Sequence, residues 1–539
     1  MSTRSYRRLR IALGGLVLGF CLLAFADVGD WVPAIAARAG LWLQLTPSLI
    51  AITQGVGWIS AGCIAVLLLT LVCGRIYCAM LCPLGILMDL SAWIARRTGR
   101  KRKLPYRPGH PWIRTLAVVV CALGLILGSA VPLGLLDPYS IFGKIISATV
   151  RPALGWLNQT ISLTGAIQPV DVSPVAWTSI GVALGLLAVV VIAAMLRGRL
   201  WCNTLCPVGA VLGFFSRFSI FRLQISADAC VACSLCEQSC PAQCIDFKNH
   251  RIDHSRCIMC LDCVTSCRRN GIHLTSNRGS VGQKHPASPP VVVAAAMEST
   301  TTRHQPAPLL PTNRRLFLAS ALSLPTLAMA KSKHDDADEN GRCHGPNRLT
   351  QHNKKAVLPP GAQSLAHFQS HCTACQLCVT HCPDQVLRPS ITQHGLSGFL
   401  QPYQDFTTSF CSYNCSNCSE ICPTGAIQTI TVEERRLIRT GTAELFLDRC
   451  VVKTEGTSCG ACSEHCPTQA VHMVPWKGGL TLPEMDPDLC IGCGGCEFIC
   501  PVRPDKAIIV TGLPVHERAT AIERGEENTV RKMEEEFPF

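Results

Sequence analysis

The sequence predicts a multidomain protein in which an α-helical membrane domain is joined to small α+β domains. The chain has 539 residues, more than one ordinary domain holds. Apolar residues make up 48% of it, charged residues only 16%, and the mean hydropathy is +0.27, which predicts that part of the chain lies in lipid. Its 34 cysteines recur in the pattern CxxCxxCxxxC, which indicates metal ligands because disulfide frameworks do not repeat it.

Four apolar segments predict four transmembrane helices, at residues 11–26, 51–72, 112–132 and 176–196. Each approaches the ~20 residues that cross a hydrocarbon layer. Basic residues lie before the first segment, between the second and third, and after the fourth, which predicts that both ends of this domain are cytoplasmic. The net charge of +13 therefore indicates a membrane protein and not a nucleic-acid binder. All 16 histidines lie outside the segments, so we expect no membrane-embedded haem.

A CxxxCP motif follows the second apolar segment, and a copy of it follows the fourth. The first copy contains Cys78 and Cys82, and the second contains Cys202 and Cys206. One interpretation is a shared redox or metal centre near the lipid headgroups, where a quinol could approach. The alternative is that small residues turn the chain after each helix. Because the two copies occupy matching positions, we favour a shared functional site.

The next motif has the spacing of a bacterial two-cluster ferredoxin. In that spacing, three close cysteines hold one 4Fe-4S cluster and the fourth reaches the neighbouring cluster. Structural zinc would need only two CxxC pairs. We expect Cys244, just outside the motif, to be a packed thiol. The predicted ligands are Cys230, Cys233, Cys236 and Cys267 for one cluster, and Cys257, Cys260, Cys263 and Cys240 for the other.

A Pro-, Ser- and Thr-rich stretch at residues 280–312 predicts a flexible linker. It leads into residues 313–330, where Arg314 and Arg315 precede an apolar run that ends in a small-x-small site. This is the layout of a twin-arginine export signal, which carries proteins already folded around cofactors. Whether the signal is cleaved or kept as a fifth span, we expect the rest of the chain to lie outside the cytoplasm. Residues 331–366 form a second linker.

Residues 367–512 contain four further cysteine sets, which repeat about every 35 residues. Four sets predict four more 4Fe-4S clusters, or six in the chain. Nested and sequential pairing of the sets are both compatible with the spacing, and the widened first gaps of sets two and three favour nesting. We expect the tail, residues 513–539, to be a solvated helix. The sets are Cys372, Cys375, Cys378 and Cys382; Cys411, Cys415, Cys418 and Cys422; Cys450, Cys459, Cys462 and Cys466; and Cys490, Cys493, Cys496 and Cys500.

These motifs resemble two partner families. Residues 1–279, with the CxxxCP pair, the ferredoxin spacing and the segment 136–143, resemble the NapH family, the membrane component of a quinol dehydrogenase. In this comparison residues 1–222 are the four-helix domain and residues 223–279 the two-cluster ferredoxin domain. Residues 313–512 resemble the NapG family, an exported ferredoxin-type protein with four 4Fe-4S clusters. The resemblance implies a fusion of the two in one chain.

The resulting hypothesis is an electron-transfer protein of the bacterial inner membrane that takes electrons from quinol. Residues 223–279 would be cytoplasmic, and residues 331–539 would deliver electrons to an extracytoplasmic reductase. The expected partners are membrane lipid, quinone, that reductase and the twin-arginine export machinery, with no nucleic acid. Residues 138–143 are a candidate contact for the quinone ring. Alternatives are a membrane redox regulator or metal-centre maturation factor, and electron supply from a cytoplasmic donor, since ligands do not fix direction.

Overall fold

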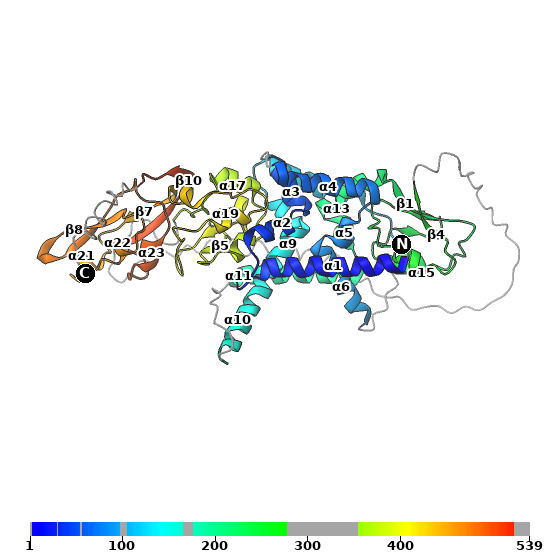
Figure 1. The fold of residues 1–539 in the computed structure, drawn as a ribbon, viewed down its shortest axis with the longest axis horizontal. Helices are drawn as coiled ribbons and strands as arrows, with labels where there is room; N and C mark the ends of the chain where they lie inside the picture. The colour runs from blue at the N-terminus through cyan, green and yellow to red at the C-terminus, as the bar shows by residue number, and fades with distance from the viewer. Residues whose placement is uncertain are drawn as a thin grey trace, which may run out of the picture. The chain divides into compact units, whose positions relative to one another are not determined.

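The computed structural model describes residues 3–29, 31–53, 57–97, 105–164, 176–276 and 354–521 (Figure 1). Residues 1–280 and 350–539 form one compact unit. The predicted linker at 280–312, the twin-arginine segment at 313–330 and most of the second linker lie outside the described residues. Three parts of the compact unit are named here by their residues: the helical module (3–218), the first cysteine-rich module (221–276) and the second cysteine-rich module (354–521).

The helical module contains long apolar helices and short helices that carry the motifs. Two of its helices, Ser5–Ala26 and Trp177–Arg197, are long and apolar enough to cross a membrane, which is weak evidence for spanning. Its elements are α1 (Thr3–Ala26), α2 (Ala34–Gly40), α3 (Leu45–Thr53), α4 (Gly57–Cys73), α5 (Tyr77–Met80), α6 (Pro83–Arg97), α7 (Pro111–Ile126), α8 (Val131–Leu136), α9 (Pro138–Ile145), the π-helix η1 (Ile146–Val150), α10 (Arg151–Ser162), α11 (Trp177–Arg197), α12 (Leu200–Thr204), α13 (Pro207–Phe215) and the 3-10 helix η2 (Ser216–Phe218).

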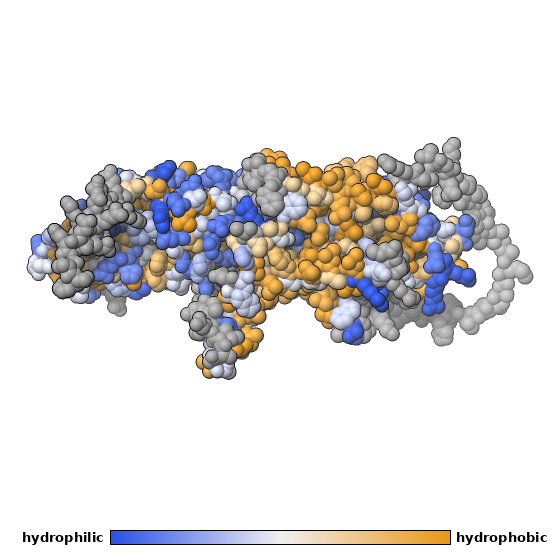
Figure 2. Space-filling model, viewed as in Figure 1, coloured by the Kyte–Doolittle hydropathy of each residue, from blue (hydrophilic) through white to orange (hydrophobic). Residues whose placement is uncertain are grey.

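The other two predicted spans are shorter in the structure than the sequence suggested. The segment 51–72 falls on α3 and α4, and the segment 112–132 falls on α7 and the start of α8. The α7 helix ends at Ile126, and Gly128 has a φ of +76°, a left-handed conformation that breaks the helix. Apolar side chains on α1, α4, α7 and α11 nevertheless face outward, among them Leu16, Leu68, Leu123 and Ile192 (Figure 2).

The first cysteine-rich module has the small α+β fold that the spacing predicts. The outer strands β1 (Phe221–Ile225) and β4 (Ile272–Ser276) pair antiparallel, with Leu223 opposite Leu274. The inner strands β2 (Ile245–Asp246) and β3 (Arg251–Ile252) form a second hairpin. One short helix follows each CxxCxxC loop, α14 (Leu235–Ser239) and α15 (Asp262–Ser266).

The second cysteine-rich module repeats this plan with three two-stranded sheets. The sheets pair β5 (Leu387–Pro389) with β6 (Pro402–Gln404), β7 (Ile438–Leu445) with β10 (Ile508–Arg518), and β8 (Val471–Pro475) with β9 (Thr481–Met485). The helices are α17 (Leu365–His371), α18 (Leu377–Thr380), α19 (Asn417–Ile421), α20 (Val432–Arg435), α21 (Val451–Thr454), α22 (Ala461–Glu464) and α23 (Gly495–Ile499), with the 3-10 turns η5 (Leu396–Gly398) and η6 (Lys477–Gly479).

The start of the tail is a strand and not the predicted helix. Residues 513–518 continue β10, whose Glu517 lies opposite Arg439 of β7. The backbone N–H and C=O groups of this strand find hydrogen-bond partners on β7. In a solvated helix the same groups would have to pair within the segment itself. Residues 522–539 lie outside the described residues.

Candidate metal centres

The same backbone conformation recurs in four ligand loops. In the CxxCxxC loops that begin at Cys230, Cys257, Cys372 and Cys490, the residues just before and just after the second cysteine have positive φ. In the first loop these residues are Ala232 and Ser234, with φ values of 51° and 58°. Left-handed residues on either side of the second cysteine turn the backbone back on itself. The three thiols of the loop can then point toward one common centre. The widened loops at Cys411 and Cys450 lack this pattern among their described residues.

In the first cysteine-rich module the structure groups the eight predicted ligands as the spacing predicts. A cavity of about 200 Å³ is lined by Cys230, Cys233, Cys236 and Cys267, named group I here. A smaller cavity is lined by Cys240, Cys257, Cys260 and Cys263, named group II. Four of the predicted ligands line each cavity, which matches the four thiolate ligands of one 4Fe-4S cluster.

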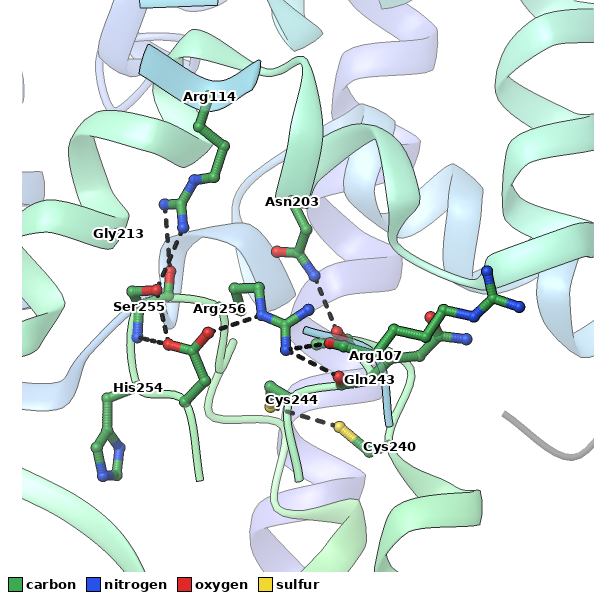
Figure 3. Close-up of polar contacts among 12 residues, drawn as sticks. Arg107, Arg114, Asn203, Gly213, Cys240, Gln243, Cys244, His254, Ser255 and Arg256 are labelled. Carbon is green, nitrogen blue, oxygen red and sulfur yellow. Dashed lines mark hydrogen bonds and ion pairs between the residues drawn. The ribbon is translucent and has the colours of Figure 1, made fainter. Parts of the chain in front are cut away.

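Cys244 also lines the group II cavity, which the sequence did not lead us to expect. Its Sγ lies 3.5 Å from the Sγ of Cys240 (Figure 3). This hydrogen bond lowers the pKa of Cys240 to about 7. A thiol that donates to a ligand sulfur stabilises the negative charge on that ligand. The only sequence feature that could have indicated this contact is that Cys244 follows Cys240 by four residues.

In the second cysteine-rich module the sets pair sequentially, so the preference for nesting was wrong. Burial, and then the charges of Cys372, Cys375, Cys422 and Cys418, raise the pKa of Cys378 well above its usual value, and of the two set-two cysteines Cys422 acts more strongly. The last cysteine of set two therefore joins set one. The reciprocal group combines Cys382 with Cys418 and its neighbours in set two. These are group III (Cys372, Cys375, Cys378 and Cys422) and group IV (Cys382, Cys411, Cys415 and Cys418).

Sets three and four pair in the same way. Burial, and then Cys459, Cys450 and Cys500, raise the pKa of Cys462 to about 11. Around Cys496 the charged neighbours are Cys493, Cys490 and Cys466. Each pair of adjacent sets therefore forms one compact α+β unit. Nested pairing would instead have required set one to contact set four, at the two ends of the module. These are group V (Cys466, Cys490, Cys493 and Cys496) and group VI (Cys450, Cys459, Cys462 and Cys500).

Groups IV and V lie next to each other, which fixes the order of the four groups. The backbone N–H of Cys411 donates to the carbonyl of Cys493 at 2.9 Å. The buried Arg435 of α20 donates to the Sγ of Cys411 at 3.3 Å. Since groups III and IV share two sets, as do groups V and VI, the order is III, IV, V, VI. Sequence analysis did not identify Arg435, which lies in no cysteine motif.

The four CxxxCP cysteines are buried together in the helical module. Cys78, Cys82, Cys202 and Cys206 are each 3–4% exposed. Cys82 accepts a backbone N–H from Gly85, and Cys206 accepts one from Gly209. We name these four cysteines the central group.

The first cysteine-rich module is attached to the helical module next to Cys202, through contacts that include Asn203 (Figure 3). Asn203, the residue after Cys202, donates to the carbonyl of Ala242 at 3.0 Å. The backbone N–H of Arg199 donates to the carbonyl of Pro241 at 3.0 Å. On α1, Arg10 donates to the carbonyl of Cys260 at 2.9 Å. Group II therefore faces the helical module, whereas Cys233 of group I is exposed.

The second cysteine-rich module contacts the helical module through group III. The backbone N–H of Ala130 donates to the carbonyl of Gln369 at 2.9 Å. A Cβ at Gly143 would lie 2.2 Å from the carbonyl oxygen of Cys375, so only glycine fits there. All residues of α9, from Pro138 to Ile145, are buried. The ligand loop of group III packs against this segment at Gly143, and the expected contact of residues 138–143 with a quinone ring stays a prediction.

Family models match three segments of the chain. Residues 55–101 and 179–226 match a model described as a 4Fe-4S binding domain, and each segment contains one CxxxCP motif. Residues 456–503 match a 4Fe-4S dicluster domain, which agrees with the pairing of sets three and four. No solved structure matches the chain.

Among curated relatives, the chain is 30% identical over 181 residues to the methylamine utilization ferredoxin-type protein MauN of Paracoccus denitrificans, covering 32% of this chain and 50% of that protein. It is 26% identical over 274 residues to MauN of Methylobacillus flagellatus, covering 46% and 83%. It is 27% identical over 146 residues to the ferredoxin-type protein NapF of Escherichia coli, covering 27% and 80%. The chain is an iron–sulfur protein homologous to ferredoxin-type electron transport proteins. The finer resemblance to a NapH–NapG fusion stays a prediction.

Proposed function

We propose that this iron–sulfur protein is a membrane quinol dehydrogenase component that passes electrons from quinol to an extracytoplasmic reductase. Groups I to VI would hold one 4Fe-4S cluster each. The outward-facing apolar side chains of α1, α4, α7 and α11 support a membrane location with four spans, the shorter two being α4 and α7. The first cysteine-rich module contacts α1 at Arg10. Near the other end of α1, Phe25 packs on Tyr139 of α9, and both Phe25 and the carbonyl of Cys375 in the second module lie beside Gly143 of α9. This supports placing the modules on opposite faces of the membrane.

The observation that carries the proposal is a cavity of about 420 Å³ between the helical module and the second cysteine-rich module. Its lining on one side includes Lys144, Ser147 and the first turns of α11. On the other side it includes Gln376, which lies in the ligand loop between Cys375 and Cys378. A cavity of this size, reached from apolar helices, suits the headgroup of a membrane quinol.

Two residues that line this cavity carry buried oxygen atoms that could accept the hydroxyl donors of a quinol. The Oγ of Ser179 and the Oε1 of Gln376 have no hydrogen-bond partner among the described residues, although both side chains are buried. A buried acceptor without a partner costs free energy, which a donating ligand would recover. A quinol hydroxyl at Gln376 would lie against the loop that holds group III, so its electrons would enter there.

From group III the order of the groups supports an outward route through IV and V to VI. Two ligands of group VI, Cys459 and Cys462, are half-buried, and no residue of α22, which carries Cys462, is buried. Group VI is therefore the most accessible point of the second cysteine-rich module for a soluble acceptor. Exposed Cys233 gives group I a comparable surface for a cytoplasmic partner.

The test uses the purified full-length chain in lipid nanodiscs under anaerobic conditions. After mixing with menaquinol or ubiquinol, we expect the visible absorbance of the oxidised clusters to bleach, with one quinone formed for every two electrons taken up. The proposal is overturned if the clusters stay oxidised with both quinols while dithionite reduces them.

A further inference from the structure

The central group is built from two copies of a longer motif than CxxxCP. Each copy reads Gly-Arg-x-x-Cys-x-x-Leu-Cys-Pro-x-Gly, from Gly74 to Gly85 and from Gly198 to Gly209. Both leading glycines have positive φ, +70° and +62°, which turns the chain sharply out of α4 and α11. The two copies therefore place an arginine and two cysteines in matching local structures.

The arginines cross over between the copies. Arg75 of the first copy donates to the carbonyl of Cys202 at 3.2 Å. Arg199 of the second copy donates to the carbonyl of Cys78. The last glycine of each copy leaves room for the other copy's arginine: a Cβ at Gly85 would lie 2.6 Å from Arg199, and one at Gly209 would lie 2.8 Å from Arg75. This exchange holds the four thiols together as one unit.

The charge of Arg75 is not balanced by any carboxylate in the described structure. Arg199 pairs with Asp89 at 2.6 Å, but Arg75 donates only to the amide of Asn203, to backbone carbonyls and to the Sγ of Cys78. Its side chain is fully buried, and its Nε has no partner among the described residues. A buried cation needs an anion nearby. The groups whose negative charge would act on Arg75 are Cys78, Cys202 and Cys206.

The donor set decides which anion fits. Four cysteine thiolates are the ligand set of a 4Fe-4S cluster. A disulfide would be neutral and would leave Arg75 unbalanced. Each segment that matches the 4Fe-4S binding model carries one copy of the motif, so the two segments together supply four motif cysteines.

We propose that Cys78, Cys82, Cys202 and Cys206 together hold one additional 4Fe-4S cluster, which relays electrons between the two cysteine-rich modules. In each relay step one electron leaves a reduced neighbouring cluster and reduces this one, and no bond forms or breaks. The assignment does not depend on the quinol proposal, because cluster content is measured without any donor.

The position of the central group fits a relay. Gly14, in the middle of α1, lies beside Ile86 and the carbonyl of Ala79, within the first CxxxC. Toward one end of α1, Arg10 binds the group II loop, only one turn away. Toward the other end, Phe25 is 11 residues from Gly14, or about 16 Å along the helix.

A row of buried polar groups spans that longer interval. Tyr77, next to Cys78, donates to Gln44 at 2.9 Å, and Gln44 donates to the carbonyl of Leu81 at 3.1 Å. Two residues after Gln44, Thr46 donates to Asp137, which caps α9 beside group III. Buried polar side chains therefore link the first CxxxCP motif to residues 44–46, and residues 44–46 to the start of α9.

The first test counts iron and acid-labile sulfide in the anaerobically purified full-length chain. Seven clusters predict about 28 iron atoms per chain, against about 24 for six. We expect C82S and C206S each to lose about four iron atoms. The matched control C63S, which changes a buried cysteine on α4, should keep all of them. Unchanged iron in both C82S and C206S, or about 24 atoms in the unaltered chain, overturns the proposal.

The second test keeps all four ligands and so does not depend on how the ligand variants fold. R75Q removes the positive charge, so we expect full iron content and a more negative reduction potential for one cluster, followed by EPR in a redox titration. R75K should restore the potential. If Arg75 were only structural, R75Q would lower iron content and leave the remaining potentials unchanged, which would contradict its role beside a cluster.

Discussion

The two cysteine-rich modules differ in which of their ligand groups lies nearest the helical module. In the first module the group nearest the helical module is group II, three of whose ligands come second in the sequence, and group I is exposed. In the second module the nearest group is group III, whose ligands come first. The difference shows that contacts with the helical module, and not order along the chain, decide which group is the inner one. In both modules the outermost group is the more accessible.

Loss of the inner group of the second module should have the largest effect. C375S removes a ligand of group III, so quinol should no longer reduce any group of this module. C462S, at the outer group, should remove only the last group and leave quinol-driven reduction of groups III to V. EPR of the reduced chains measures both. Equal loss in the two variants would contradict the order of the groups.

The cavity beside group III should set the rate of electron entry. Q376A removes an acceptor next to Cys375, and one lost hydrogen bond of about 1–3 kcal/mol predicts roughly 5- to 150-fold slower reduction by quinol. The matched control is Q363A, an exposed glutamine of the same module, which should change nothing. Stopped-flow absorbance gives the rates. An unchanged rate of reduction in Q376A would show that quinol does not bind at this cavity.

Acid should destabilise the second module more than the first. Burial, and then the charge of Arg435, lowers the pKa of His516 to about 4. Below pH ~6.5 the unfolded chain takes up a proton that the folded chain does not, so stability is complete above that pH and is lost as pH falls toward 4. The loss should reach about 3 kcal/mol. His254 in the first module also has a lowered pKa, by burial and then by Arg222, but no comparably large shift.

Thermal unfolding of the purified chain between pH 7 and pH 4, compared with H516Q, measures this effect. H516Q should flatten the pH dependence, since Gln does not titrate. An unchanged slope would show that other groups control acid sensitivity.

Group I should be the first centre lost to an oxidant. Cys233 is exposed and opens the group I cavity to solvent, whereas all four ligands of group II are buried. Mild oxidation should therefore remove the group I cluster before the group II cluster. EPR after stepwise ferricyanide treatment follows the order, and simultaneous loss would contradict the difference in exposure.

A small stability difference should follow from helix capping. In the second module Thr431 and Glu434 form a capping box at α20, the helix that carries Arg435. In the first module neither α14 nor α15 has a side-chain cap. T431A should cost about 1 kcal/mol of unfolding free energy. Chemical denaturation measures it, with S234A at the uncapped start of α14 as a control expected near zero.

Local spacing indicated which cysteines would line each cavity of the first module, because a CxxCxxC loop folds on itself. Their role as cluster ligands stays a prediction. The pairing of the four sets in the second module depends on which strands and helices pack together. The widened first gaps of sets two and three carry no information about that packing, and the nested pairing expected from them was wrong. The Cys411 loop is held by the carbonyl of Cys493, a contact with no local signal. Arg75 and Arg199 did have a signal, the Gly-Arg pair before each CxxxC, which becomes meaningful only once the crossed contacts are seen. The burial of residues 138–143 followed from a tertiary contact.

The central claim is that quinol electrons enter the second cysteine-rich module at group III. The most direct measurement is rapid freeze-quench EPR of the full-length chain in lipid after mixing with menaquinol, in the unaltered protein and in C375S. The account predicts that clusters of the second module are reduced before those of the first, and that C375S abolishes their reduction. Reduction of groups I and II first, or an unchanged time course in C375S, would contradict it.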